Sequence, residues 1–437
     1  MKSTLLSVLL TLSATFSYSQ QNLYFPPLVG SNWDTLSPES LGWCTENIPA
    51  LYDYLAAENS KAFIVLKDGK IVLEQYFDSF TRDSLWYWAS AGKTLTAFLT
   101  GIAQEEGYLS LQDPTSMYLG DGWTSCPADK EDLITVRHQL TMSSGLDDGV
   151  VDPFCTLPSC LQYLADAGTR WAYHNGPYTL LDDVIADATG QNFSLYFNSR
   201  LRNKIGMNGF WFPQGFNNVY FSNARSMARF GLLTLNHGVW AADTILHDQQ
   251  YFTDMVNTSQ TLNKSYGYLW WLNGKESYMI PGLQFVFNGK LLPNAPNDNI
   301  AAMGKNGQFV NVAPSQNLVM IRMGNAPDNS LISYLLNNGI WQRLNEVICT
   351  ATATNSISEA DTGFRLYPNP ATETFHLQLD DEQTPFSVQL FSLTGQLIWQ
   401  AQNTPTLDAT PLTPGVYVVR LQQGERVYVQ RLAKGRL

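Results

Sequence analysis

Hydrophobic and polar positions alternate with helical and strand periods between about residues 33 and 349. Two apolar runs, Ala62–Lys67 and Ile71–Phe77, flank the turn Asp68-Gly69 and predict a two-stranded hairpin. Further strands are expected late in this region, with helices between them. The expected strands are Phe285–Phe287, Gln308–Ala313 and Leu318–Met323, and the expected helices are Cys44–Glu58, Lys93–Gln104, Leu180–Ala188, Phe193–Lys204, Arg225–Asn236 and Leu331–Val347. Strands at both ends with helices between them predict an α/β domain over residues 20–350, in which one sheet is built from both ends of the domain.

The first 19 residues have the pattern of a secretory signal peptide. Lys2 gives a positive start, an apolar run follows from Leu5 to Phe16, and Ser17-Tyr18-Ser19 supplies small residues before Gln20. A transmembrane anchor is the alternative, but the run is shorter than the ~20 residues that span a bilayer. We therefore expect an exported protein without a membrane-spanning segment in its mature chain.

The last part of the chain has a different pattern. Residues 351–364 are rich in Ala, Thr and Ser, have no helical or strand period, and are expected to be a linker. Short alternating stretches separated by turn residues then predict a small all-β sandwich over residues 365–437. Its expected strands are Thr374–Leu379, Phe386–Phe391, Gln396–Gln400, Gly415–Leu421 and Arg426–Leu432.

Composition excludes some classes of function. Of the 437 residues, 44% are hydrophobic and 15% are charged, which suits a packed globular protein rather than a disordered one. The formal net charge of −12 would repel a phosphate backbone, so we expect no nucleic-acid partner. The histidines are scattered and no His-Glu-x-x-His or Cys-x-x-Cys spacing occurs, so we expect no metal and no cofactor.

A serine and a lysine stand three residues apart in Ser90-Ala91-Gly92-Lys93. On a helix both side chains face the same way, and a partly neutral lysine would accept the proton of the serine. Burial or a neighbouring cation would lower the lysine pKa as this requires. The alternative is a helix-capping serine with a surface lysine. The preceding Trp86-Tyr87-Trp88 is expected to lie in the core.

A second group is Tyr173-His174-Asn175. A tyrosinate near two lysines would act as a base, provided that its pKa fell by about 3 units from its ordinary value near ~10. Asn175 would either hold the acyl side of a substrate or keep Lys93 in place. The alternative is a turn that contains a packed aromatic residue.

A third group is Gly304-Lys305-Asn306-Gly307-Gln308, directly before an expected strand. Lys305 would be the second cation, and Gly307 would let a substrate lie against the strand. The backbone N–H of Gln308, together with that of Ser90, would form an oxyanion hole. The alternative is a Gly-Asn turn that enters a strand.

These three groups together, in this order, resemble the signature of the serine β-lactamase-like hydrolases and penicillin-binding proteins. The resemblance covers about 300 residues and includes Ile134–Leu140 and Ser144-Gly145-Leu146. It implies an antiparallel sheet flanked by helices, with a helical subdomain, and assigns Ser90 as nucleophile with Lys93 and Tyr173 as proton-transfer groups. Tyr-x-Asn is similar to the motif of class C β-lactamases, esterases and D-aminopeptidases. The run Tyr266–Trp271 is similar to nylon-oligomer hydrolases and related carboxylesterases.

The resemblance implies an ester, amide or short peptide as the substrate. Asn306 stands where the lactamases have a threonine, so the hydroxyl that helps hold a β-lactam carboxylate is absent. We therefore expect an esterase or amidase. A true β-lactamase, a D-amino-acid peptidase, or a catalytically inactive surface binding protein on the same fold are the alternatives.

The C-terminal segment also resembles a known family. Leu366–Pro370, Leu393–Gln396, Leu412–Tyr417 and the basic tail near Arg431–Lys434 are similar to the C-terminal sorting domain of the type IX secretion system. This resemblance implies contact with that secretion machinery and a secreted or cell-surface location. A carbohydrate-binding or adhesive β-module is the alternative.

The implied fold also predicts disulfides. In this fold the first and last helices lie together on one face of the sheet, so the start of one lies near the end of the other. Cys44 opens the first helix and Cys349 closes the last, so we expect these two to be bonded in an oxidising compartment. Cys155 and Cys160 bracket a Pro-containing loop and are the expected second pair, which leaves Cys126.

Overall fold

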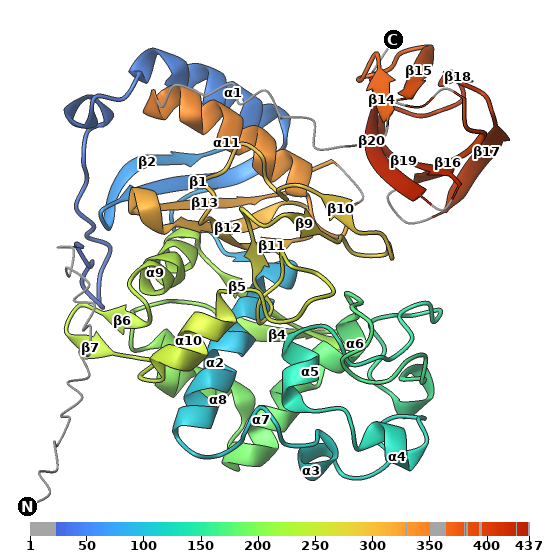
Figure 1. The fold of residues 1–437 in the computed structure, drawn as a ribbon. Coiled ribbons are helices and arrows are strands. Elements are labelled where there is room, and N and C mark those ends of the chain that lie inside the picture. Colours follow the sequence, from blue (N-terminus) through green and yellow to red (C-terminus); the bar gives the residue numbers. More distant parts are fainter. Residues whose placement is uncertain are drawn as a thin grey trace, which may run out of the picture.

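The computed structural model describes residues 23–327, 330–349 and 364–435, except 380, 382, 393–395 and 425. The predicted signal peptide and residues 351–363 of the predicted linker lie outside the described residues. The described chain forms a large α/β unit followed by a small β-sandwich, each with its own hydrophobic core (Figure 1). Within the described residues, no helix combines the length and the apolar character needed to cross a membrane.

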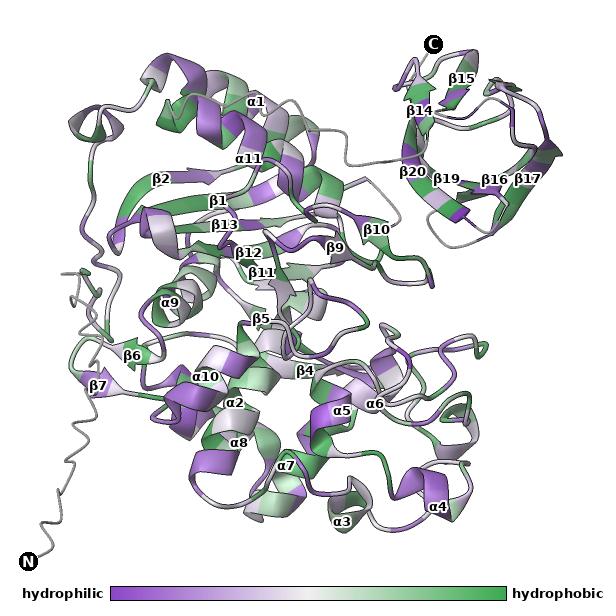
Figure 2. Ribbon diagram, viewed as in Figure 1, coloured by the Kyte–Doolittle hydropathy of each residue, from purple (hydrophilic) through white to green (hydrophobic). Residues whose placement is uncertain are grey.

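The central sheet of the large unit is antiparallel and joins strands from both ends of the unit. In spatial order its strands are β2 (Lys70–Tyr76), β1 (Ser60–Lys67), β13 (Leu318–Gly324), β12 (Gln308–Ala313), β11 (Ile300–Gly304) and β8 (Trp271–Leu272). The predicted first hairpin is present, with Lys67 opposite Lys70. β1 is an almost continuous hydrophobic strand because both of its faces are covered (Figure 2). The strand expected at Phe285–Phe287 instead forms β10 (Phe287–Asn288), which pairs with β9 (Ser277–Tyr278) outside this sheet.

Helices cover both faces of the sheet. The first and last helices, α1 (Ile48–Ala57) and α11 (Tyr334–Ile348), lie together on one face, and α9 (Ala224–Leu235) packs on β12 and β13 from the other (Figure 1). α9 begins where the Asn223 side chain accepts a hydrogen bond from the Ser226 backbone N–H. This arrangement agrees with the predicted single sheet between helices.

A helical region lies below the sheet in Figure 1. Its central helix, α2 (Lys93–Glu105), is buried at every position from Lys93 to Ala103, because other helices surround it. The expected helix Phe193–Lys204 is instead a short α-helix followed by a π-helical turn at Asn198–Arg202. The other helices of the region are α3 (Ser116–Leu119), α4 (Ala128–Glu131), α5 (Val136–Leu140), α6 (Asn175–Thr179), α7 (Leu181–Thr189), α8 (Phe193–Phe197) and α10 (Gln249–Met255).

A three-stranded antiparallel sheet lies between the central sheet and the helical region. Its strands are β3 (Trp86–Tyr87), β5 (Asn217–Ser222) and β4 (Phe210–Gln214), in that spatial order. A separate small hairpin joins β6 (Val239–Trp240) to β7 (Asp243–Thr244).

The C-terminal unit consists of two antiparallel sheets. One has the order β14 (Phe364–Tyr367), β15 (Thr374–Leu379), β18 (Thr406–Asp408), and the other β17 (Leu397–Gln402), β16 (Phe386–Ser392), β19 (Gly415–Gln423), β20 (Arg426–Lys434). Residues alternate between buried and exposed along β15, as in a strand with one face on a core. The predicted small all-β sandwich is therefore present.

Two disulfides join the pairs that the sequence analysis expected. Cys44 and Cys349 lie with their Cα atoms 5.6 Å apart, and the Cys44 N–H donates to the Val347 carbonyl. Cys155 and Cys160 have Cα atoms 5.9 Å apart, and Cys126 is a free thiol. The first bond ties the ends of the α/β unit, whereas the second closes one loop.

Candidate active site

Ser90 lies in a tight 3₁₀ turn, Ala89–Gly92, that leads directly into α2. Ala89 has a positive φ of 46°, a strained conformation for a residue with a side chain. The turn is anchored from one side because the Trp88 N–H donates to the Tyr220 carbonyl and the Trp88 indole to the Ser222 hydroxyl. Trp88 lies in the core, as expected. Ser90 is thereby held at the junction of α2 and the three-stranded sheet.

Lys93, the first residue of α2, contacts Ser90. Its Nζ lies 3.0 Å from the Ser90 Oγ and 2.7 Å from the Asn175 Oδ1, and 4.0 Å from the centre of the Tyr178 ring. Burial lowers the pKa of Lys93 to about 7, and the charge of Asp182 opposes this shift. A large fraction of Lys93 is therefore neutral near neutral pH and available to accept a proton. Asn175 holds this lysine in place, which is one of its two expected roles.

Tyr173 is buried beside Ser90, with its ring stacked on Trp271 at 5.7 Å between ring centres. Burial raises the pKa of Tyr173 well above its ordinary value, although a hydrogen bond with Ser90 works in the opposite direction. The expectation of a tyrosinate is therefore not supported, because desolvation outweighs the hydrogen bond with Ser90. A protonated phenol at this position is a proton donor rather than a base.

The third group forms the turn between β11 and β12. Gly304, the last residue of β11, lies against the Ser90 turn: a Cβ atom there would be 2.6 Å from the Trp88 carbonyl oxygen and 3.1 Å from the Ser90 nitrogen. Lys305 follows and lines the cleft. The Asn306 amide donates a 2.7 Å hydrogen bond to the Tyr87 hydroxyl. Residues 304–308 thus form a Gly-Asn turn that also places the Lys305 side chain at the cleft.

Two residues of this group have other roles than those expected. Gly307 is not among the cleft-lining residues: its carbonyl accepts a 2.7 Å hydrogen bond from Arg322, whose side chain occupies the space where a Cβ would stand. Gln308 is fully buried and does not line the cleft; its side-chain amide donates to the carbonyls of Lys305 and Gly324, and its backbone pairs with Gly304 in the β11–β12 hairpin. It is Gly304, rather than Gly307, that lies against the turn carrying the nucleophile.

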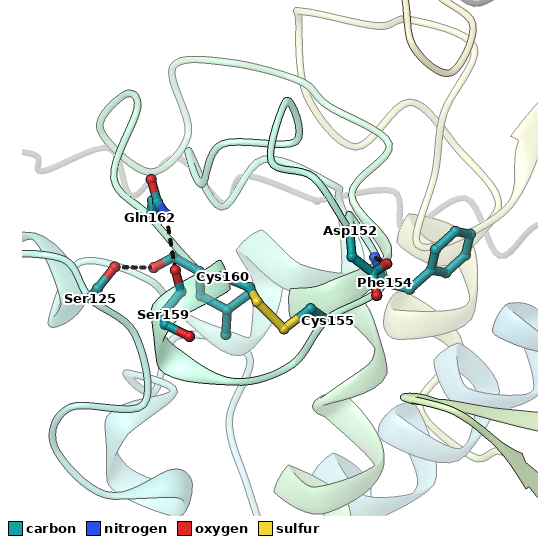
Figure 3. The surroundings of a disulfide bond; sticks show 8 residues. Ser125, Asp152, Phe154, Cys155, Ser159, Cys160 and Gln162 are labelled. Carbon is teal, nitrogen blue, oxygen red and sulfur yellow. Dashed lines mark hydrogen bonds between the residues drawn. A yellow bond between two sulfur atoms is a disulfide. The ribbon is translucent and has the colours of Figure 1, made fainter.

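The cleft around Ser90 has a volume of about 240 Å³. Its walls come from several elements, and the residues that line it besides Ser90, Lys93, Tyr173, Asn175 and Lys305 are Tyr87, Ala89, Phe154, Tyr178, Gln214, Asn217, Asn218, Val219 and Leu331. Tyr87 was expected in the core, but it faces the cleft. Phe154 precedes the Cys155–Cys160 disulfide, and Figure 3 shows its side chain directed away from the disulfide.

One acidic residue near the site was not identified from sequence. Asp182 on α7 accepts hydrogen bonds from the Thr96 hydroxyl at 3.2 Å and from the Asn218 amide at 2.9 Å. Burial raises the pKa of Asp182 to about 7. Its position on the buried side of a helix that follows Tyr173 and Asn175 is the signal that would have pointed to it. In the described part of the chain, no three His, Cys, Asp or Glu side chains form a group that could hold a metal ion.

Comparison with family models gives two matches. The model described as Beta-lactamase matches residues 54–331, more than half of the chain. The model described as Secretion system C-terminal sorting domain matches residues 365–434. Among curated proteins, an uncharacterised protein of Alkalihalophilus pseudofirmus is 23% identical over 318 residues, which are 64% of this chain and 88% of that protein.

Solved structures share the fold. A putative β-lactamase from Bacteroides dorei has a TM-score of 0.56 at 17% identity, over 70% of this chain and 98% of that one. A putative 6-aminohexanoate-dimer hydrolase from Bacillus anthracis has a TM-score of 0.52 at 21% identity, over 68% and 82%. A family VIII carboxylesterase has a TM-score of 0.51 at 15% identity, over 69% and 98%. These identities show the fold alone, and they confirm the fold class predicted from the sequence.

Proposed function

Because the chain belongs to the β-lactamase family and ends in a secretion sorting domain, we propose that it is an exported serine hydrolase that cleaves an ester or amide through a Ser90 acyl-enzyme. The observation that carries this proposal is the contact of 3.0 Å between the Ser90 Oγ and the buried Lys93 Nζ, a lysine whose pKa burial lowers to about 7. The family consists mostly of serine hydrolases, and the similar carboxylesterase and 6-aminohexanoate-dimer hydrolase structures support ester or amide bonds as the target.

In the first step, neutral Lys93 accepts the Ser90 hydroxyl proton while the Ser90 oxygen attacks the substrate carbonyl carbon. The backbone N–H groups of Ser90 and Lys305 are the proposed donors to the oxyanion, because Gly304 brings the end of β11 against the Ser90 turn. Lys305 thus replaces Gln308 in this role.

In the second step, the protonated Tyr173 donates its proton to the leaving alcohol or amine as the carbonyl–leaving-group bond breaks. Lys93 returns the serine proton to the Tyr173 oxygen and becomes neutral again. A water molecule then gives a proton to Lys93 and attacks the acyl carbon. The bond between the acyl carbon and the Ser90 oxygen breaks, the acid leaves, and Lys93 returns that proton to the Ser90 oxygen. Each proton taken up by Lys93 is returned within the cycle.

Labelling of Ser90 tests the mechanism directly. The full chain is expected to react with a fluorophosphonate probe and to hydrolyse p-nitrophenyl acetate with a burst of product. Ser90→Ala is expected to abolish both, whereas Ser84→Ala, a serine in a nearby turn, keeps both. Labelling of Ser90→Ala at another serine would contradict the assignment. Parallel assays with nitrocefin and D-Ala peptides separate an esterase from a β-lactamase or a D-amino-acid peptidase, and no reaction with any probe would favour a binding protein.

The proposed location rests on the sorting domain at the C-terminal end and on the signal-peptide pattern at the N-terminal end. The sorting domain supports secretion or cell-surface display and implies contact with the secretion machinery. We propose that residues 1–19 are removed as a signal peptide before residues 365–437 direct the protein through the type IX system. Mass spectrometry of the exported protein tests this, with Gln20 as the expected first residue.

A further inference from the structure

The three-stranded sheet of β3, β5 and β4 has two chemically different faces. Its inner face is in the core, where Trp211 and Tyr220 are buried. On its outer face, the register places Tyr87, Phe221 and Phe210 in one row across the three strands, because directly opposed residues of antiparallel strands share a face. The next rows of this face are Phe212 opposite Val219 and Gln214 opposite Asn217.

The phenylalanines of this outer face form an exposed aromatic surface. Phe210 and Phe212 are 48% and 49% exposed, and Phe216 in the turn between the two strands is 38% exposed. The Phe210 ring stacks on Phe221 with 5.8 Å between ring centres and an angle of 7°, and Phe212 meets the same ring edge-on at 6.2 Å. Single exposed apolar side chains are ordinary, but a stacked group on one sheet face is typical of a binding surface.

This surface continues into the cleft. Tyr87, Val219, Asn217 and Gln214 lie on the same outer face and line the cleft around Ser90. The Tyr87 ring lies 6.2 Å from the Phe221 ring, so aromatic contact extends without interruption from the cleft wall to the exposed phenylalanines. The Asn306 amide holds the Tyr87 hydroxyl at 2.7 Å, which fixes the ring at this junction.

The side chains of the outer face indicate which kind of ligand binds there. Its side chains are aromatic, aliphatic or amide, and none of the seven residues of the three rows carries a charge. A neutral, apolar and extended group fits such a surface, since it gains contact with the rings and leaves no ion without a partner. Because the face begins at the wall of the cleft, a group that lies on it can be covalently joined to a carbonyl at Ser90.

We infer that the outer face of the β3–β5–β4 sheet binds the hydrocarbon chain of a long-chain ester substrate whose carbonyl carbon is attacked by Ser90. This inference rests on the proposed function and names its substrate class. It assigns Phe210 and Phe212 as specificity-determining residues outside the cleft, with Tyr87 as the link between cleft and surface.

A chain-length series of p-nitrophenyl esters, from acetate to octanoate, tests the inference on the full chain. Each methylene group that is fully buried on an apolar surface strengthens binding about fourfold, and on this open face about twofold is expected. Octanoate has six more methylene groups than acetate, so the value of kcat/KM should rise on the order of 60-fold between them. In the double variant Phe210→Ser/Phe212→Ser this rise should largely vanish, while the rate with acetate stays within about twofold.

Matched controls separate the possible outcomes. Met117→Ser removes another exposed apolar side chain, 69% exposed, on α3 and should keep the full chain-length dependence. If acetate is cleaved through Ser90 but kcat/KM does not rise with chain length, or if the double variant keeps the rise, only this inference is overturned. If no ester is cleaved through Ser90, the proposed function fails as well. A wild-type dimer that the double variant converts to a monomer, with no loss of chain-length dependence, would make the face a self-association surface and would also overturn the inference.

Discussion

The side-chain amide of Asn218 donates a 2.9 Å hydrogen bond to Asp182, a buried carboxyl group that also raises the pKa of Lys93. Asn218 lines the cleft from β5, Asp182 belongs to α7, and the Thr96 hydroxyl of α2 donates to the same carboxyl group. One carboxyl group therefore connects the cleft wall, the helix that carries Lys93, and the charge state of the proposed base. Asp182 is a positioning residue, because it acts on the reaction through Asn218 and Lys93.

Replacement of Asp182 is expected to change the pH profile. The negative charge of Asp182 favours the ammonium form of Lys93, so Asp182→Asn should lower the Lys93 pKa. Since neutral Lys93 is the active form, activity is lost as the pH falls through about 7, and this acidic limb of kcat/KM should move to lower pH in the variant. Asp187→Asn, an exposed carboxylate on the same helix, is the control and should leave the limb in place. An upward shift in Asp182→Asn would contradict the coupling.

Lys93 is expected to be indispensable as a neutral amine. Lys93→Arg keeps a positive charge and a long side chain, but a guanidinium group does not give up its proton near neutral pH. The rate of Ser90 acylation by a fluorophosphonate should fall by about 10²- to 10⁴-fold, the usual contribution of a general base. Lys130→Arg, in the surface pair with Asp166, should react like the wild type. Labelling of Lys93→Arg at the wild-type rate would show that another group takes the proton.

Gly304 is expected to be the point at which the central sheet positions the nucleophile. In Gly304→Ala, the added carbon would stand 2.6 Å from the Trp88 carbonyl oxygen and 2.9 Å from the Ala91 nitrogen, so the strand and the Ser90 turn must move apart. A displacement of about 1 Å in an active site costs on the order of 100-fold in rate. We expect kcat for p-nitrophenyl acetate to fall by this factor. Gly92→Ala is the matched control, because its added carbon finds no heavy atom closer than 3.7 Å. Equal activity of both variants would contradict this role.

The sequence predicted the parts of the site that depend on local spacing. Residues three apart, such as Ser90 and Lys93, lie one turn apart in a helix, so the motif predicted their contact. The spacing of hydrophobic residues likewise predicted the first hairpin and α9. Parts that depend on contacts between segments far apart in the sequence were not predicted. The oxyanion role was assigned to the backbone N–H of Gln308, because only the packing of the end of β11 on the Ser90 turn shows that Gly304 lies there.

Burial of single polar or aromatic residues was equally inaccessible from the sequence. Asp182 and Asp183 are adjacent identical residues, and only the packing of α7 shows that the first is buried and the second exposed. Tyr87 lies between two tryptophans, so no polar alternation indicated that its side chain faces the cleft while Trp88 enters the core. The pKa of Tyr173 was expected to fall through nearby lysines, but desolvation is a property of the whole packed site.

The Cys44–Cys349 disulfide is expected to contribute mainly to stability, and the Cys155–Cys160 disulfide mainly to catalysis. The Cys44–Cys349 bond closes a loop of 305 residues, and a disulfide over a long loop stabilises mainly by restricting the unfolded chain. Cys44→Ser/Cys349→Ser should therefore lose about 2–5 kcal/mol of unfolding free energy. It should keep the kcat and KM of the wild type, because neither residue lines the cleft.

The Cys155–Cys160 bond joins residues only five positions apart, so it restricts the unfolded chain little. Its removal should therefore change the free energy of unfolding less than removal of the Cys44–Cys349 bond. Its loop, however, carries Phe154 into the cleft, and Cys155→Ser/Cys160→Ser should raise KM for esters. Thermal unfolding and ester kinetics of both double variants, each with Cys126 retained, measure the two effects. The prediction is contradicted if the Cys155–Cys160 variant is the less stable of the two, or if KM rises in the Cys44–Cys349 variant instead.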